Sequence, residues 1–200
     1  MNMIFKKLSV FFLFIIVSCE PAGSSFNPNP EPIIPSEINV GSGVFTFTKN
    51  NIDFEVFYHV PESYNSNSKI LFTMHGGSRD PEGIRDNAIA KSNEYNFIVI
   101  APKFSAENFP LGDGYNLGNV YEDGDNPSTT TLNNEEEWSF SVIEPLFDSV
   151  VSALSLTEEK YNLFGFSAGA QFVHRFILFK PNARFEKVVA GAAGWYTVPD

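Results

Sequence analysis

Apolar and polar positions repeat with two different periods along this chain, and these periods predict alternating strands and helices. Residues 44–48 and 52–58 alternate apolar and polar side chains, and Lys49-Asn50-Asn51 between them predicts a hairpin turn. Continuous apolar runs are typical of strands buried on both faces. Such runs occupy residues 70–74, 97–101 and 161–164, and residues 187–193 predict one strand more.

Three longer stretches between these runs have helical periodicity. They span residues 81–95, 135–154 and 168–180, and in the second of them Pro145 predicts either a kink or a restart. Residues 102–134 form a long loop rich in Gly, Asn, Asp and Pro. An antiparallel start followed by repeated strand–helix units predicts an α/β fold, with a mostly parallel sheet covered by helices on both faces.

The first nineteen residues have the pattern of an export signal. Two lysines precede about ten mostly apolar residues, a run shorter than the ~20 residues that span a bilayer. Ile16-Val17-Ser18-Cys19 is similar to a bacterial lipobox, and Cys19 is the only cysteine in the chain. We therefore expect a lipoprotein signal peptide over residues 1–18 and lipidation of Cys19, with an ordinary signal peptide or anchor helix as the alternative.

A proline-rich stretch separates this leader from the rest of the chain. Residues 19–37 contain five prolines among Ser, Asn, Gly and Glu, a composition that predicts an extended tether. Residues 38–200 then form one α/β domain, for which 21 Phe provide a sizeable core. The predicted location is that of an exported bacterial lipoprotein, in the cell envelope or on the cell surface, held to the membrane through its N-terminal lipid only.

Charge and composition restrict the partners. The formal net charge of −11 disfavours nucleic acids and anionic lipid surfaces, and it is compatible with a neutral substrate. We see no cofactor fingerprint and predict no metal site. Asp113, Glu122, Asp123 and Asp125 crowd the long loop and could hold Ca²⁺, but without EF-hand spacing they favour a solvated acidic loop.

The strongest chemical signal is Gly165-Phe166-Ser167-Ala168-Gly169. It lies between a predicted strand and a predicted helix, which is the context of a nucleophile elbow with the serine hydroxyl at its apex. The glycines are expected to permit the tight bend. Backbone N–H groups at the start of the next helix would face a developing oxyanion. Ser167 is therefore the candidate nucleophile, and the alternative is a glycine-rich turn with an idle serine.

A second motif, His75-Gly76-Gly77, directly follows the strand predicted over residues 70–74. Acyl transfer needs at least two N–H donors at the oxyanion. We expect Ala168 to provide one donor and Gly77 or Gly76 the other. His75 is predicted to be structural rather than the general base.

Together these segments resemble a known family. Residues 70–79, 115–120, 165–176 and 192–197 are similar to secreted α/β-hydrolases, especially the polyhydroxybutyrate depolymerase and feruloyl esterase-like group. The resemblance covers most of residues 45–200. It implies the α/β-hydrolase fold and ester hydrolysis by a Ser–His–Asp triad, with Ser167 as nucleophile and oxyanion donors at Ala168 and Gly77. Phe166 departs from the His that many relatives carry.

The larger departure concerns the acid and the base. In this fold the triad order is Ser, then Asp or Glu, then His, and none of His59, His75 and His174 fits that order. His174 lies about 10 Å along the helix from Ser167, out of reach of its hydroxyl. We therefore expect the last strands and helix, the catalytic acid and the catalytic His to lie beyond residue 200.

Aromatic residues near the expected site leave its pocket open to two interpretations. Phe104, Phe109 and Tyr115 either line a substrate pocket or pack the long loop onto the core, and Trp195 is either pocket wall or core. The favoured function is a serine hydrolase acting on carboxylic esters, small or polymeric. The alternatives are a truncated, non-catalytic hydrolase-like lipoprotein and, with less support, a serine peptidase.

Overall fold

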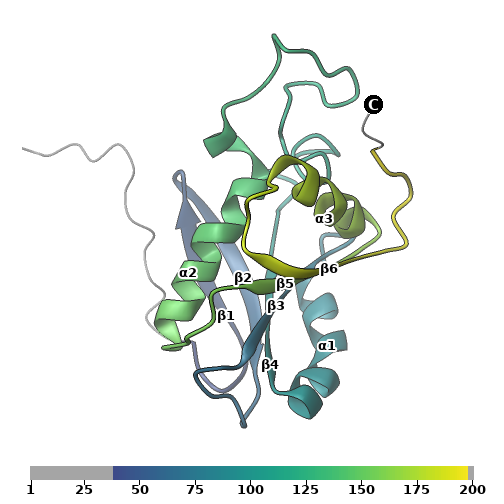
Figure 1. Ribbon diagram of the computed structural model, residues 1–200. Helices are drawn as coiled ribbons and strands as arrows, with labels where there is room; N and C mark the ends of the chain where they lie inside the picture. Colours follow the sequence, from purple (N-terminus) through teal and green to yellow (C-terminus); the bar gives the residue numbers. More distant parts are fainter. Residues whose placement is uncertain (1–37, 198–200) are drawn as a thin grey trace, which may run out of the picture. The chain divides into compact units, whose positions relative to one another are not determined.

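The computed structural model describes residues 38–197 (Figure 1). The predicted signal peptide, the tether and Cys19 lie outside the described residues, as do residues 198–200. Within the described part of the chain, no helix has the length and apolar character needed to cross a bilayer.

Six strands form one sheet in the order β1-β2-β4-β3-β5-β6. The strands are β1 (Gly41–Lys49), β2 (Ile52–Val60), β3 (Lys69–Met74), β4 (Phe97–Pro102), β5 (Tyr161–Phe166) and β6 (Phe185–Gly191). The first two form the expected hairpin, and β2 runs antiparallel to β4. The remaining neighbours, from β4 through β3 and β5 to β6, are parallel. The predicted mostly parallel sheet is thus confirmed, with one crossover where β3 inserts between β4 and β5.

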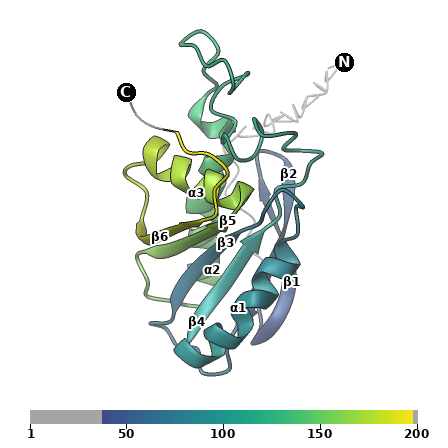
Figure 2. The same cartoon turned by 90° about the vertical axis from the view of Figure 1, so that its right-hand side faces the viewer.

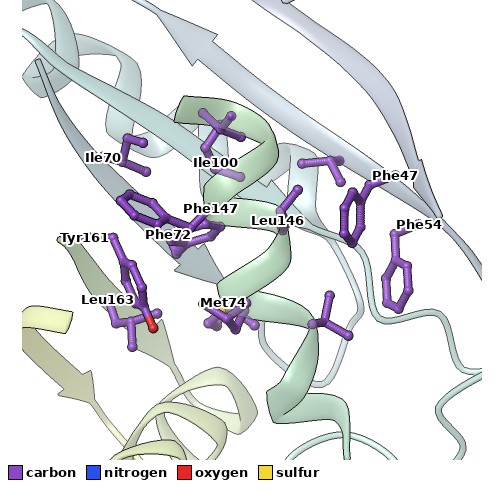
Figure 3. Packing of buried hydrophobic residues seen from close by; sticks show 14 of the residues in the cluster. Phe47, Phe54, Ile70, Phe72, Met74, Ile100, Leu146, Phe147, Tyr161 and Leu163 are labelled. Carbon is purple, nitrogen blue, oxygen red and sulfur yellow. The ribbon is translucent and has the colours of Figure 1, made fainter. Parts of the chain in front are cut away.

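Three α-helices cover the two faces of this sheet. They are α1 (Pro81–Tyr95), α2 (Ile143–Ala153) and α3 (Ala168–Phe179). The two views show α1 on the face opposite α2 (Figures 1 and 2). The main core lies between the sheet and the helices α2 and α3. There Ile70, Phe72 and Met74 of β3 are fully buried, and Leu146 and Phe147 of α2 point toward them (Figure 3).

The α1 face is built differently. Asp80 accepts a hydrogen bond from the Gly83 amide at 2.8 Å and caps the helix, while Pro81 occupies the first turn, where no N–H is required. Arg85 is buried and donates to the carbonyl of Tyr58 at 2.8 Å. Polar anchoring therefore fixes α1 on the sheet, beside the apolar contacts.

The helix predicted over residues 135–154 is not continuous. Two 3₁₀ turns, Glu135–Glu137 and Ser139–Val142, precede α2, which begins at Ile143. Pro145 therefore lies in the first turn of α2, where its missing N–H costs no helical hydrogen bond. Of the two outcomes expected at Pro145, the structure has the restart.

Candidate functional site

Ser167 lies at a sharp turn between β5 and α3, and it is exposed. Its backbone has φ 55° and ψ −116°, an unusual conformation for a residue with a side chain. The Ser167 amide donates to the carbonyl of Gly191 at 3.0 Å, which ties the turn to the end of β6. The strand–turn–helix geometry holds the hydroxyl out of the turn in the manner of a nucleophile elbow.

The two glycines of the elbow are required by close packing. A Cβ on Gly165 would lie 2.1 Å from the carbonyl oxygen of Gly169, and a Cβ on Gly169 would lie 2.0 Å from the carbonyl oxygen of Met74. Neither glycine has a positive φ, which Ser167 itself adopts. The glycines therefore permit the tight bend through close packing and not through a positive φ: Ser167 takes the strained conformation, and the missing side chains let α3 approach β5 and β3.

The His75-Gly76-Gly77 segment lies next to the elbow, as expected. A Cβ on Gly76 would lie 3.7 Å from the Cβ of Ser167, whereas a Cβ on Gly77 would meet no atom within 4 Å. The amide of Ala168, the first residue of α3, has no acceptor within the helix. Backbone from two separate segments therefore lies beside the serine, and the N–H groups of these segments are the candidate oxyanion donors.

His75 holds this segment in place as a neutral imidazole. The amide of Phe104 donates to its Nε2 at 3.1 Å, so the proton lies on Nδ1, which donates to the carbonyl of Gly76 at 3.0 Å. Burial lowers the pKa of His75 from 6.5 to about 4, and the Gly76 hydrogen bond only partly opposes this shift. With both ring nitrogens occupied, His75 has no free nitrogen for Ser167, in keeping with a structural role.

Tyr115 and Arg79 add further restraints to the same segment. The Tyr115 hydroxyl donates to the carbonyl of His75 at 2.7 Å, and burial raises the pKa of Tyr115, so the donor stays protonated. The Arg79 guanidinium lies 4.5 Å from the centre of the Tyr115 ring and donates to the carbonyls of Phe104, Phe109 and Leu111. The loop after β4 is thereby fastened to the segment that bears the candidate oxyanion donors Gly76 and Gly77.

A groove of about 660 Å³ opens beside Ser167 on the α1 face of the sheet. Its sides come from the sheet and from α1, and Ser167, Gly76 and Gly77 are among its lining residues. The apolar part of its lining consists of Leu71, Ile84, Ala88, Phe164 and Phe166. A substrate could therefore reach the serine along a largely apolar surface.

The aromatic residues expected near the site do not line this groove. Phe104, Phe109 and Tyr115 are buried, and their rings pack against one another and against Phe54 and Phe172. They fasten the loop to the core and do not line the groove beside Ser167, although Phe109 also borders a separate cavity. Trp195 is about half exposed and lines a different cavity, against Arg175.

The other two histidines are also engaged elsewhere. His174 Nε2 accepts from the amide of Thr197 at 3.0 Å, and His59 hydrogen-bonds Ser42 and Asn93. Within residues 38–197, therefore, no histidine is available as a general base at Ser167.

The acidic loop supplies its own hydrogen-bonding partners. Asp123 accepts from the amides of Asp125 and Asn126, and Asp113 accepts from the amide of Gly124 at 3.0 Å. In the part of the chain that the structure describes, no three His, Cys, Asp or Glu side chains gather as a metal site would require.

Two residues that form contacts near Ser167, Asn116 and Arg79, were not predicted from the sequence pattern. The Asn116 amide donates to Gln171 at 2.7 Å, which joins the long loop to α3 one turn after Ser167. Arg79, described above, is the other. Both Asn116 and Arg79 lie within the segments that resemble the family. That resemblance is the sequence signal that could have identified them as residues near the site.

No family model and no curated protein matches this chain. Several solved structures, in contrast, are similar to this chain. Poly(aspartic acid) hydrolase-1 from Sphingomonas sp. KT-1 is 40% identical with a TM-score of 0.75, over 82% of this chain and 60% of that chain. A poly(3-hydroxybutyrate) depolymerase from Bordetella parapertussis is 28% identical with a TM-score of 0.72, over 81% of this chain and 55% of that chain.

A third neighbour shares the fold at lower similarity. It is an acetyl xylan esterase from Aspergillus awamori, 20% identical with a TM-score of 0.54, over 75% of this chain and 52% of that chain. The chain thus has the α/β-hydrolase fold, and its resemblance to the depolymerase and esterase-like group is confirmed. It spans somewhat more than half the length of these relatives.

Proposed function

We propose that this chain is the nucleophile-bearing part of a serine hydrolase that cleaves carboxylic ester bonds. The observation that carries the proposal is the strained, exposed Ser167 between two segments with available backbone N–H groups. Strain of this kind, held by close glycine packing, is a recurrent property of catalytic turns.

In this mechanism the Ser167 hydroxyl attacks the ester carbonyl and gives its proton to a general base. The amides of Ala168 and Gly77, with Gly76 beside them, stabilise the oxyanion. Collapse of the tetrahedral intermediate expels the alcohol, which takes up that proton, and water then releases the acyl group by the same steps. The three histidines of the chain are engaged elsewhere, so we propose that the base and its acid lie beyond residue 200.

The groove beside Ser167 supports an ester with an apolar portion. Its apolar lining offers contacts to an acyl or alkyl chain, and the net charge of −11 favours a neutral or weakly charged substrate. An amide substrate is the second candidate, because one relative is named as a hydrolase of poly(aspartic acid), a polyamide. No observation favours the non-catalytic alternative over these two.

Fluorophosphonate labelling of the full-length protein tests the proposal. We expect labelling that disappears in Ser167→Ala and persists in Ser78→Ala, a matched control because Ser78 lines the same groove outside the elbow. A well-folded full-length protein that is not labelled would contradict the catalytic proposal and support the non-catalytic alternative. Parallel assays on p-nitrophenyl esters and on poly(aspartic acid) separate ester from amide hydrolysis.

We also propose that the protein is held at the cell envelope by a lipid on Cys19. The lipobox-like sequence and the proline-rich stretch after it support this location. Globomycin treatment of the producing cells should leave unprocessed precursor. An unchanged mature mass would contradict the proposal.

A further inference from the structure

Arg175 on α3 is a deeply buried cation. Only 1% of its surface is exposed, and no ion pair involving it occurs among residues 38–197. Because an arginine stays protonated, burial without a carboxylate leaves a charge uncompensated, which is costly for a folded protein.

Its hydrogen bonds are incomplete on one side. Nε donates to the Thr197 hydroxyl at 3.0 Å, and Nη1 donates to the carbonyls of Gln171 at 3.0 Å and Asn116 at 3.3 Å. Nη2 has no partner, although it is buried. The guanidinium is thus positioned by three acceptors, while Nη2 has no acceptor among residues 38–197.

This guanidinium lies at a cavity of about 360 Å³. Apolar and aromatic side chains make up much of its wall, among them Leu117, Tyr121, Phe179 and Trp195. The Trp195 ring lies 4.1 Å from the guanidinium carbon and is about half exposed, in a segment outside helices and strands.

We propose that Arg175 binds the carboxylate of an organic anion whose apolar part fills this cavity. A carboxylate is the acceptor that a guanidinium edge matches best. Arg175 follows Ser167 by eight residues on α3, about 12 Å along the helix. The cavity and the groove beside Ser167 have no lining residue in common, so the proposed carboxylate site is a second site.

The surroundings favour a single carboxylate over a polyanion. Asp125 is the one carboxylate in the lining, and Glu122 and Asp123 lie in the same loop. These exposed acids repel a chain of repeated negative charges, whereas one buried cation satisfies one carboxylate.

Isothermal titration calorimetry of the full-length protein tests the proposal directly. The probes are phenylacetate and phenylacetamide, which have closely similar shapes and differ in charge. We expect phenylacetate to bind once per chain and about tenfold tighter than the amide, the size of one charge-assisted hydrogen bond. Ser167→Ala should bind phenylacetate as wild type does, so this result is independent of whether the protein hydrolyses esters.

Two variants locate the binding. Arg175→Lys keeps a charge but loses the planar fork, and we expect it to weaken phenylacetate binding about tenfold. Asp125→Asn removes the exposed carboxylate beside the cavity, and we expect it to strengthen phenylacetate binding about twofold while leaving phenylacetamide unchanged. Asp125 is exposed, so its variant tests the proposal even if Arg175→Lys fails to fold. Equal binding of the two probes, or an unchanged affinity in Asp125→Asn, would overturn it.

Discussion

On one face of the sheet, α2 and α3 bury Ile70, Phe72 and Met74 completely, whereas on the other face α1 leaves Leu71 and Phe164 partly exposed at a groove of about 660 Å³. Successive residues of β3 thus meet different environments: Phe72 contacts the Tyr161 ring edge-to-face at 5.3 Å, while Leu71 borders the groove. A strand alternates its side chains between faces, so one short sequence serves both.

The two faces of the sheet differ in role: one contributes most of the buried apolar surface, and the other borders the candidate nucleophile. The closed face buries most of the aromatic side chains and supplies the larger share of apolar burial. The open face carries the groove that Ser167 lines. Ser167 lies where the two faces meet. The turn at Ser167 follows β5, whose side chains point to both faces, and it precedes α3, which lies on the closed face.

The sharpest test of this comparison uses the two neighbours on β3. We expect Phe72→Ala to lower the free energy of unfolding by about 3–5 kcal/mol, because it leaves a cavity in a closed core. In a protein consisting of residues 38–200, Leu71→Ala should cost about 1 kcal/mol, since this side chain is already partly exposed there. Urea unfolding measures both. Equal losses would show that the faces contribute alike.

At the junction, His75 makes the stability of the elbow region depend on pH. Its pKa is lowered to about 4 in the folded protein from 6.5, so between these values the unfolded chain binds more protons. Stability from the neutral imidazole is present above pH 6.5 and is lost as the pH falls toward 4, by about 3 kcal/mol. We expect His75→Gln to flatten this part of the stability profile, measured by urea unfolding from pH 7 to 4. An unchanged slope would contradict the assignment.

Glycine packing at the elbow gives the next largest effect. We expect Gly169→Ala to lower the free energy of unfolding by about 2–3 kcal/mol, because its methyl group would overlap the carbonyl oxygen of Met74. Gly77→Ala is the matched control on the open face. Its methyl group meets no atom within 4 Å, and we expect an unchanged melting temperature. A stable Gly169→Ala protein would show that α3 can shift away from β3.

The smallest effect on stability concerns Val189 on β6, the last strand of the sheet. Val189 is 54% exposed, beside Phe164 on the open face. For a protein consisting of residues 38–200, we expect self-association through this apolar edge. Val189→Lys should reduce it in sedimentation velocity, with a change in unfolding free energy within about 0.5 kcal/mol. Thr46→Lys, exposed on β1, is the control. A monodisperse wild-type protein would contradict this expectation.

Periodicity determined the order and type of nearly every element, because strands and helices space their buried side chains differently. The Gly-x-Ser-x-Gly motif marked the turn at Ser167, which lies between a strand and a helix as expected. Periodicity failed over residues 135–142. The first 3₁₀ turn, Glu135–Glu137, has no buried residue, the second, Ser139–Val142, does not keep the α-helical spacing, and the apolar face of the helix begins only at Ile143.

The amino-acid sequence by itself therefore determined the α/β architecture and the candidate serine, because both depend on local spacing along the chain. Only the tertiary structure decided that Phe104, Phe109 and Tyr115 belong to the core, that His75 is a neutral tether, and that the elbow glycines serve close packing. An aromatic loop residue has the same local signal in a pocket and in a core. What distinguishes the two is which distant segments pack against it, and local periodicity does not encode those contacts.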